Sequence, residues 1–298
     1  MPIVIKQART SQQLVDILEH RHHCVYATNG RIVDHLDVLP TTTNIVAYLD
    51  GAIVGSCRVT LFERGKPKLW KDFDFSEASS KVEGLLGFID MTSISVSANL
   101  FATLFQYLYK MGTFQLLQKG YQHVFGFCDP EDFSTLEALG FRSLVSEPSD
   151  FVPVALDIKE FSQRFESVFA DREILRFQEV FYFSIFQPGE VMVVEGERGN
   201  TAYVAERGEV EVVIRSEQGL LSISQIPTGQ LIGEVAMITN EPRTASLISK
   251  GTTACVSFDR SDFLRIMYAE PHRSIEIFRI LSRRLSASNK RIAELGKV

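Results

Sequence analysis

The stretch GQLIGEVAMITNEPRTASLI, residues 229–248, is the most informative part of this sequence. Gly233 allows the backbone to approach a ligand closely, and Glu234 places a hydrogen-bond acceptor directly after it. Residues 234–238 can form one helical turn, whose free N–H groups favour an anion. The guanidinium of Arg243 offers a fork of donors that suits a phosphate. The stretch therefore predicts a site for one compact anion that carries a neighbouring hydroxyl group.

Thr244 and Ala245 extend this predicted site with a hydroxyl group and backbone N–H groups. The same residue types also fit an exposed Glu–Arg pair on a surface loop, which would contribute ~0–1 kcal/mol to stability. Spacing alone leaves both interpretations open.

The residues around this stretch predict a small β-rich domain. From residue 186 to residue 258, short β-rich runs alternate with turns that contain glycine, which is typical of a β-barrel or sandwich. Helices follow, and the longest carries an apolar stripe that is more often buried core than a switch. The stripe consists of Ile275, Phe278, Leu281 and Leu285.

The central run resembles the phosphate-binding cassette of cyclic nucleotide-binding domains of the cAMP receptor and protein kinase regulatory type. The matching residues are Gly233, Glu234, Val235 and Ala236, then Arg243, Thr244 and Ala245. The resemblance extends over about residues 160–295 and includes the upstream glycine turns at Gly199-Asn200 and Gly208. It implies a jelly-roll β-barrel in which Glu234 takes the ribose 2′-hydroxyl and Arg243 takes the cyclic phosphate of cAMP or cGMP. Ile232 and Asn200 depart mildly from the family pattern.

The N-terminal half alternates helices and strands. A helix begins after Thr10, a hairpin turns at Asp50-Gly51, and strands are expected over 85–96 and 121–128. A strongly apolar helix is predicted over 98–117, and a short helix ends at Gly140. This order predicts an α+β class, with a mixed sheet and flanking helices. The prolines of SEPSDFVPV lead us to place the domains at 1–156 and 157–298.

This half resembles the GNAT-type N-acyltransferase fold, and more narrowly the acyl-homoserine lactone synthases and long-chain N-acyl amino acid synthases. The resemblance covers about residues 10–145. It rests on Arg21 with Val25-Tyr26, the D-x-x-D of Asp34 and Asp37, Gly55 to Arg58, and Asp90 to Ser93.

The resemblance implies transfer of a fatty acyl group from an acyl thioester, on a carrier protein or coenzyme A, to a small amine. Asp90 would assist deprotonation of the amine. Arg21, Asp34, Asp37 and Arg58 would hold the acceptor or organise its loop. Two departures matter: Ser93 replaces an expected basic residue, and the usual pyrophosphate loop is missing, which argues against acetyl-CoA. The alternative is a non-enzymatic cyclic-nucleotide receptor with a degenerate acyltransferase domain that binds a ligand or protein.

Composition limits the partners and the cellular compartment that we expect for this protein. The chain has 298 residues, is 45% hydrophobic and carries a formal net charge of −6, which argues against nucleic acid as a partner. We expect no DNA-reading helix after the nucleotide domain. No apolar run approaches the ~18 residues of a membrane span. Four separated cysteines indicate reduced thiols in the cytoplasm, and no metal site is predicted. A homodimer and a carrier-protein partner are compatible with this interpretation.

Overall fold

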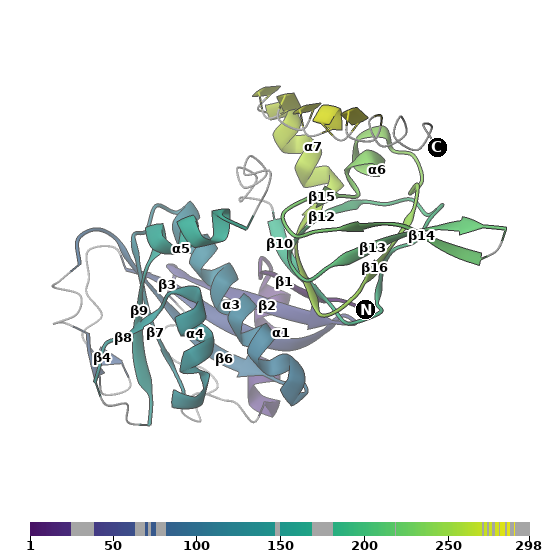
Figure 1. Cartoon of the computed structure of the whole chain (residues 1–298). Helices are drawn as coiled ribbons and strands as arrows, with labels where there is room; N and C mark the ends of the chain where they lie inside the picture. Colours follow the sequence, from purple (N-terminus) through teal and green to yellow (C-terminus); the bar gives the residue numbers. More distant parts are fainter. Residues whose placement is uncertain are drawn as a thin grey trace. The chain divides into compact units, whose positions relative to one another are not determined.

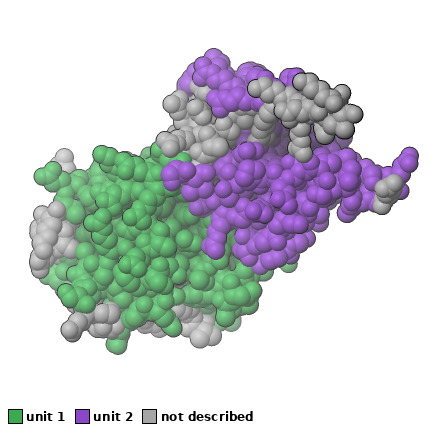
Figure 2. Space-filling view, in the orientation of Figure 1, with its two compact units in different colours: residues 1–166, 182–186 green, residues 167–181, 187–298 purple. Residues whose placement is uncertain are grey.

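The chain folds into two compact units in a computed structural model (Figure 2). The first unit comprises residues 1–166 and 182–186, and the second comprises residues 167–181 and 187–298. The structure describes residues 1–24, 39–62, 69–70, 73–75, 82–146, 150–168, 181–217 and 219–269, and then 271–272, 274–275, 278–279, 281–283, 285–286 and 289.

The first unit is built on a mixed sheet with the strand order β10-β1-β2-β3-β6-β7-β9-β8 (Figure 1). Among the described strands of this sheet, β6 and β7 form the parallel pair and the other neighbours run antiparallel. The strands are β1 (Ile3–Gln7), β2 (Thr42–Leu49), β3 (Ala52–Phe62), β6 (Leu86–Ile94), β7 (His123–Cys128), β8 (Arg142–Ser143), β9 (Val152–Asp157) and β10 (Phe181–Phe186), with β4 (Leu69–Trp70) and β5 (Phe73–Asp74) forming a separate ribbon. The predicted α+β class is therefore confirmed.

Local sequence signals place most of these elements. Asp50 and Gly51 adopt left-handed φ values of 53° and 82°, so the predicted hairpin between β2 and β3 is confirmed. Helix α1 (Ser11–His23) starts with a capping box between Thr10 and Gln13. The other helices are α3 (Ala98–Gln118), η2 (Pro130–Asp132), α4 (Phe133–Leu139) and α5 (Ile158–Glu166).

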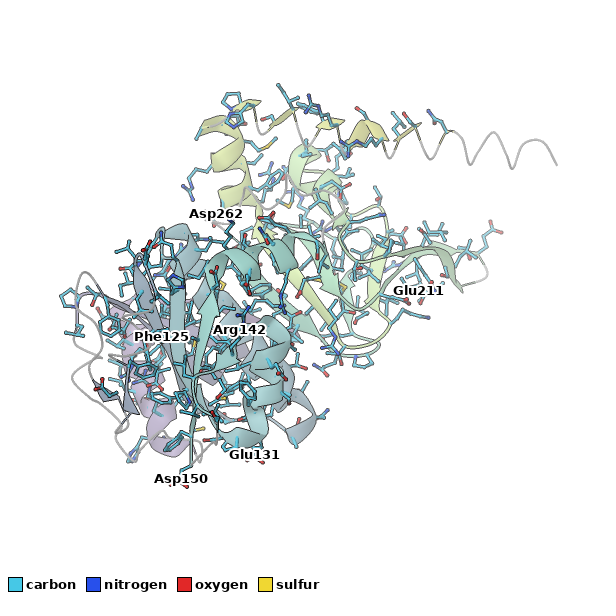
Figure 3. The ribbon with its side chains drawn as sticks, turned by 60° about the vertical axis from the view of Figure 1, so that its left-hand side comes forward. Phe125, Glu131, Arg142, Asp150, Glu211 and Asp262 are labelled. Atoms are coloured by element: carbon cyan, nitrogen blue, oxygen red, sulfur yellow. The ribbon has the colours of Figure 1, made fainter. Side chains whose placement is uncertain are left out.

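Helix α3 forms the apolar centre of this unit by packing against β2, β3 and β6. Leu104, Phe105 and Leu108 are fully buried on it. Gly87 of β6 allows the close approach, because a Cβ there would lie 2.2 Å from Leu116 Cδ2. A second apolar cluster joins Phe125, which is labelled in Figure 3, to other phenylalanines of the sheet: Phe75, Phe88 and Phe127.

The structure divides the chain later than the boundary that we predicted after residue 156. Val152–Asp157, which spans the end of SEPSDFVPV and the predicted boundary, is strand β9 and pairs with β7. Arg142, labelled in Figure 3, donates to Glu160 of α5 at 2.8 Å. Strand β10 pairs with β1 in the register Ile3↔Ile185, and Phe183 stacks edge-on against Tyr107 of α3. Aromatic packing and strand pairing therefore keep α5 and β10 in the first unit.

The second unit contains two antiparallel sheets, β15-β12-β17 and β11-β16-β13-β14 (Figure 1). Buried residues of both sheets form its core, including Val204, Val256 and Phe258 from one and Val210 and Leu247 from the other. The predicted jelly-roll type of fold is confirmed in its general architecture of two antiparallel sheets around one core. The elements are β11 (Val191–Val193), β12 (Thr201–Arg207), β13 (Val210–Ser216), β14 (Gly219–Ile226), β15 (Leu231–Ile232), α6 (Glu234–Thr239), β16 (Ser246–Ser249), β17 (Thr253–Asp259) and α7 (Arg260–Ala269).

Two expectations about helices can be compared with the described residues. Ile275, Phe278 and Leu285 of the apolar stripe are 52%, 57% and 64% exposed, so the expectation of a buried stripe is wrong for these positions. Across the part of the chain that the structure describes, every helix is too short or too polar to cross a membrane.

Candidate functional site

The candidate site in the second unit is built where β15 ends and α6 begins. Gly233 is the N-cap of α6 and adopts the left-handed conformation with φ 81°. That conformation favours glycine, and a Cβ at Gly233 would also lie 2.7 Å from Nη1 of Arg243. The turn therefore lets the main chain come close to the Arg243 guanidinium.

Arg243 is held in place by both its side chain and its backbone. Its Nη1 donates to the Gly233 carbonyl at 2.7 Å, and its Nη2 donates to the Thr201 carbonyl. Its backbone N–H donates to the Glu197 carbonyl at 2.8 Å, and its own carbonyl accepts from Gly196 at 2.9 Å. The side chain is therefore fixed in orientation before any ligand arrives, which is the condition for a strong ionic contact.

Gly199 forms the other wall of this pocket for the guanidinium. A Cβ at Gly199 would lie 1.8 Å from Nε of Arg243 and 2.1 Å from its Cζ. No side chain larger than hydrogen fits there unless Arg243 moves. The glycine turn at Gly199 was noted in the sequence as part of a family pattern, but its contact with Arg243 was not predicted.

The site places an acidic and a basic side chain together in a buried position. Glu234, the first residue of α6, is 5% exposed, and Arg243 is 8% exposed. Burial lowers the pKa of Arg243 from its usual value, whereas the nearby Tyr203 and Glu234 raise it. Burial raises the pKa of Tyr203, and the charge of Arg243 opposes that shift. A bound anion beside Arg243 would compensate for the burial of its charge.

The remaining residues predicted for this site differ in exposure. Ala236 is buried, Ala245 is partly buried and Thr244 is exposed, whereas Val235 is 41% exposed. The structure thus brings Gly233, Glu234 and Arg243 together and leaves Val235 and Thr244 at the surface.

Two of the predicted catalytic residues of the first unit, Arg58 and Asp90, form a buried ion pair. Arg58 donates to Asp90 at 2.8 Å across neighbouring strands, with side chains 3% and 4% exposed. Arg21 is 4% exposed and donates to Asn44 Oδ1 at 2.9 Å. Asp34 and Asp37 lie outside the described residues. The carboxylate of Asp90 is therefore committed to a buried ion pair, which was not predicted from its spacing.

A further polar cluster joins α1 to β6 and β3. His20 Nδ1 lies 2.9 Å from Ser93 Oγ, and His20 Nε2 lies 2.7 Å from Ser95 Oγ. Ser93 Oγ also lies 2.8 Å from Ser56 Oγ, and both of these serines are fully buried. No local sequence pattern links His20 to Ser93 and Ser95, because they lie more than seventy positions further along the chain.

The parallel strands β6 and β7 separate beside this cluster. Their pairing runs from Leu86↔His123 to Ile89↔Gly126. Beyond that point β6 continues along β3, while β7 pairs with β9 through Phe127 and Cys128. Among the described strands, none pairs with the opened edge of β6 after Ile89. Such an edge presents backbone donors and acceptors to an extended ligand.

Comparisons with known proteins concern the second unit. A family model described as Cyclic nucleotide-binding domain matches residues 184–270. The chain is 36% identical over 85 residues to a cAMP-dependent protein kinase regulatory subunit of Dictyostelium discoideum, covering 27% of this chain and 26% of that protein. It is 33% identical over 82 residues to a cGMP-dependent protein kinase of Eimeria tenella, covering 28% of this chain and 8% of that protein.

A solved cyclic nucleotide-binding domain from Methylobacillus flagellatus is 24% identical, with a TM-score of 0.40, and the match covers 47% of this chain and 85% of that chain. The present chain spans 26% or less of the two protein kinase relatives. The family match coincides with the second unit's sandwich, the turn at Gly233 and the buried Arg243. Residues 184–270 of this chain therefore form a cyclic nucleotide-binding domain.

Proposed function

We propose that this protein is an N-acyltransferase controlled by a cyclic nucleotide. The nucleotide, cAMP or cGMP, binds the second unit, and the first unit moves a fatty acyl group from a thioester to a small amine. The observation that carries the regulatory half is the buried Arg243, which is fixed between Gly199 and Gly233 beside the buried Glu234.

The chemistry of this pocket fits a cyclic phosphate joined to a ribose. The Arg243 guanidinium keeps further N–H donors beyond those used by the carbonyls of Gly233 and Thr201, and these suit phosphate oxygens. Glu234 accepts from the ribose 2′-hydroxyl, one residue after the close backbone approach at Gly233. The names of the two protein kinase relatives support cAMP and cGMP as the ligands to test.

The acyl-transfer half of the proposal is supported by topology. The order of helices and strands in the first unit fits the GNAT-type fold that the sequence resembles, with a mixed sheet and the parallel strands β6 and β7. The opened edge of β6 beyond Ile89 suits an extended acyl-thioester arm that carries amide groups. Helix α3 begins directly after this segment, and the N–H groups of its first residues, Ala98 and Asn99, suit an anion or a polarised carbonyl.

One observation favours a second candidate, a cyclic-nucleotide receptor without catalysis. Asp90, the expected proton acceptor, is 3% exposed and paired with Arg58, itself 3% exposed. A carboxylate held by a guanidinium is stabilised in its charged form and is shielded from an incoming amine. In this candidate the first unit binds a ligand or a protein, and that binding depends on whether the second unit holds a cyclic nucleotide.

Two measurements test the proposal. Calorimetry with cAMP and with cGMP measures binding to the full chain and to Arg243→Ala, whose affinity should fall about thirtyfold or more. Thiol release from long-chain acyl thioesters, offered with mixtures of amino acids and other small amines, measures transfer with and without nucleotide. Binding that survives Arg243→Ala unchanged would contradict the site. Tight binding without thiol release would favour the receptor.

A further inference from the structure

The His20 cluster of the first unit has the geometry of an activated hydroxyl group. Ser95 is exposed, and its Oγ lies 2.7 Å from Nε2 of the half-buried His20. A nucleophile and a base in this relation, with the base oriented by a further group, form the general arrangement for covalent catalysis. The orienting group here is Ser93, at 2.9 Å from Nδ1.

The buried serines accommodate the neutral form of the ring that this role requires. With hydrogen on Nδ1, His20 donates to Ser93 Oγ, and Ser93 in turn donates to Ser56 Oγ at 2.8 Å. Nε2 is then an acceptor and faces the hydroxyl hydrogen of Ser95. The chain of hydroxyl groups thus holds the imidazole in the orientation that a base requires.

The charges around His20 keep it neutral. Burial lowers the pKa of His20 below its usual value of 6.5, and the neighbouring Arg21 and His23 lower it further. Burial and the groups on α1 therefore oppose protonation of the ring, while β3 and β6 present the serine hydroxyls. A neutral imidazole is the form that can accept a proton.

We propose that Ser95 is a catalytic nucleophile that takes the acyl group from a thioester or an activated ester, with His20 as its base. This inference rests on the acyl transfer proposed above and specifies a covalent route for it. Ser95 Oγ bonds to the acyl carbon, the carbon–sulfur bond breaks, and the hydroxyl proton passes to Nε2 and then to the leaving thiolate. The amine nitrogen next attacks the acyl carbon, its proton passes to Nε2, and Ser95 Oγ leaves and recovers that proton.

The segment that follows Ser95 suits the negative charge that develops on the carbonyl oxygen. Helix α3, 21 residues long, begins at Ala98, and its N-cap residue Ser97 makes no side-chain cap hydrogen bond. The N–H groups of the first turn point toward the start of the helix, where an oxyanion is stabilised. The donors lie a few residues from the nucleophile, on the same continuous stretch of chain.

The test uses a serine-directed fluorophosphonate probe on the full chain, with the modified residue located by peptide mass spectrometry. We expect labelling at Ser95 that is lost in Ser95→Ala and slowed by about a hundredfold or more in His20→Gln. Ser97 of the unchanged chain is the internal control, because it is exposed on the same segment and should label no faster than solvent-exposed serines elsewhere. Circular dichroism establishes that each variant is folded.

The outcomes separate this inference from the proposed function. An unlabelled Ser95, or labelling equally fast in folded His20→Gln, would overturn the dyad. Thioester-to-amine transfer that persists at full rate in Ser95→Ala would also overturn it and leave direct transfer standing. Labelling at Ser95 that depends on His20, in a protein that releases no thiol with any amine, would support the dyad and contradict N-acyl transfer.

Discussion

Replacing Gly199 by alanine tests whether the pocket around Arg243 is the nucleotide site. The new Cβ would lie 1.8 Å from Nε, whereas ordinary contact begins at 3.4 Å, so the guanidinium must move by roughly the difference of 1.6 Å. That movement breaks the hydrogen bonds to the carbonyls of Gly233 and Thr201 and withdraws the charge from the phosphate position. Loss of such a charged contact costs about 2–5 kcal/mol of binding free energy, or about thirtyfold or more in affinity.

Gly251→Ala is the matched control. A Cβ at Gly251 meets no atom within 4 Å, and its φ lies outside the left-handed region, so this variant should bind as the unchanged protein does. Calorimetry with cAMP and cGMP measures the affinity of each variant. Thermal unfolding measures whether overpacking has also lowered stability, by about 1–3 kcal/mol. Unchanged affinity in a folded Gly199→Ala variant would refute the assignment of Arg243 to the phosphate.

Three further predictions concern stability and coupling. Asp90→Ala leaves the buried Arg58 without its carboxylate and should lower the unfolding free energy by about 3–5 kcal/mol in urea titrations, whereas replacing both residues by apolar ones should cost less. Because the pKa of His20 is lowered in the folded state, the unfolded chain binds the proton first as pH falls below 6.5. Stability should therefore decline with falling pH down through the folded-state pKa, and less steeply in His20→Gln, as urea titrations at about pH 7.5 and about pH 5 would measure. Cyclic nucleotide should change the affinity for a non-hydrolysable acyl-thioester analogue through ~1–3 kcal/mol of coupling, and the analogue should change nucleotide affinity by the same factor. Calorimetry of each ligand with and without the other checks this, and two unchanged affinities would contradict coupling.

The sequence predicted the nucleotide domain well because its signal is local. Gly233 and Glu234 stand side by side, and Arg243 returns after a single short helix, so one continuous stretch carries the site. Gly199 contacts Arg243 only because the pairing of β12 with β15 brings the Gly199 turn close to β15. The spacing of these residues along the chain does not predict that contact.

The first unit was harder to predict because its polar pairs span distant elements. Arg58 and Asp90 became partners through the register of β3 and β6, and His20 meets Ser95 only when α1 packs on the sheet. The run Phe181–Phe186 is apolar enough to suit any sheet, so its pairing with β1 could not be chosen from composition. The composition of a short apolar strand does not determine which strand it pairs with. Here the pairing of β10 with β1 places β10 in the first unit.

The pairing of β1 with β10 also affects folding during synthesis. Strand β1 lies at the start of the chain, yet one of its two neighbours, β10, is synthesised after α5 and the residues that follow it. While the ribosome is still translating residues 167–180, the first unit has an unpaired strand edge that can associate with other nascent chains. Expression of residues 1–166 alone would leave this edge of β1 unpaired, whereas a fragment that extends through Phe186 would pair β1 with β10.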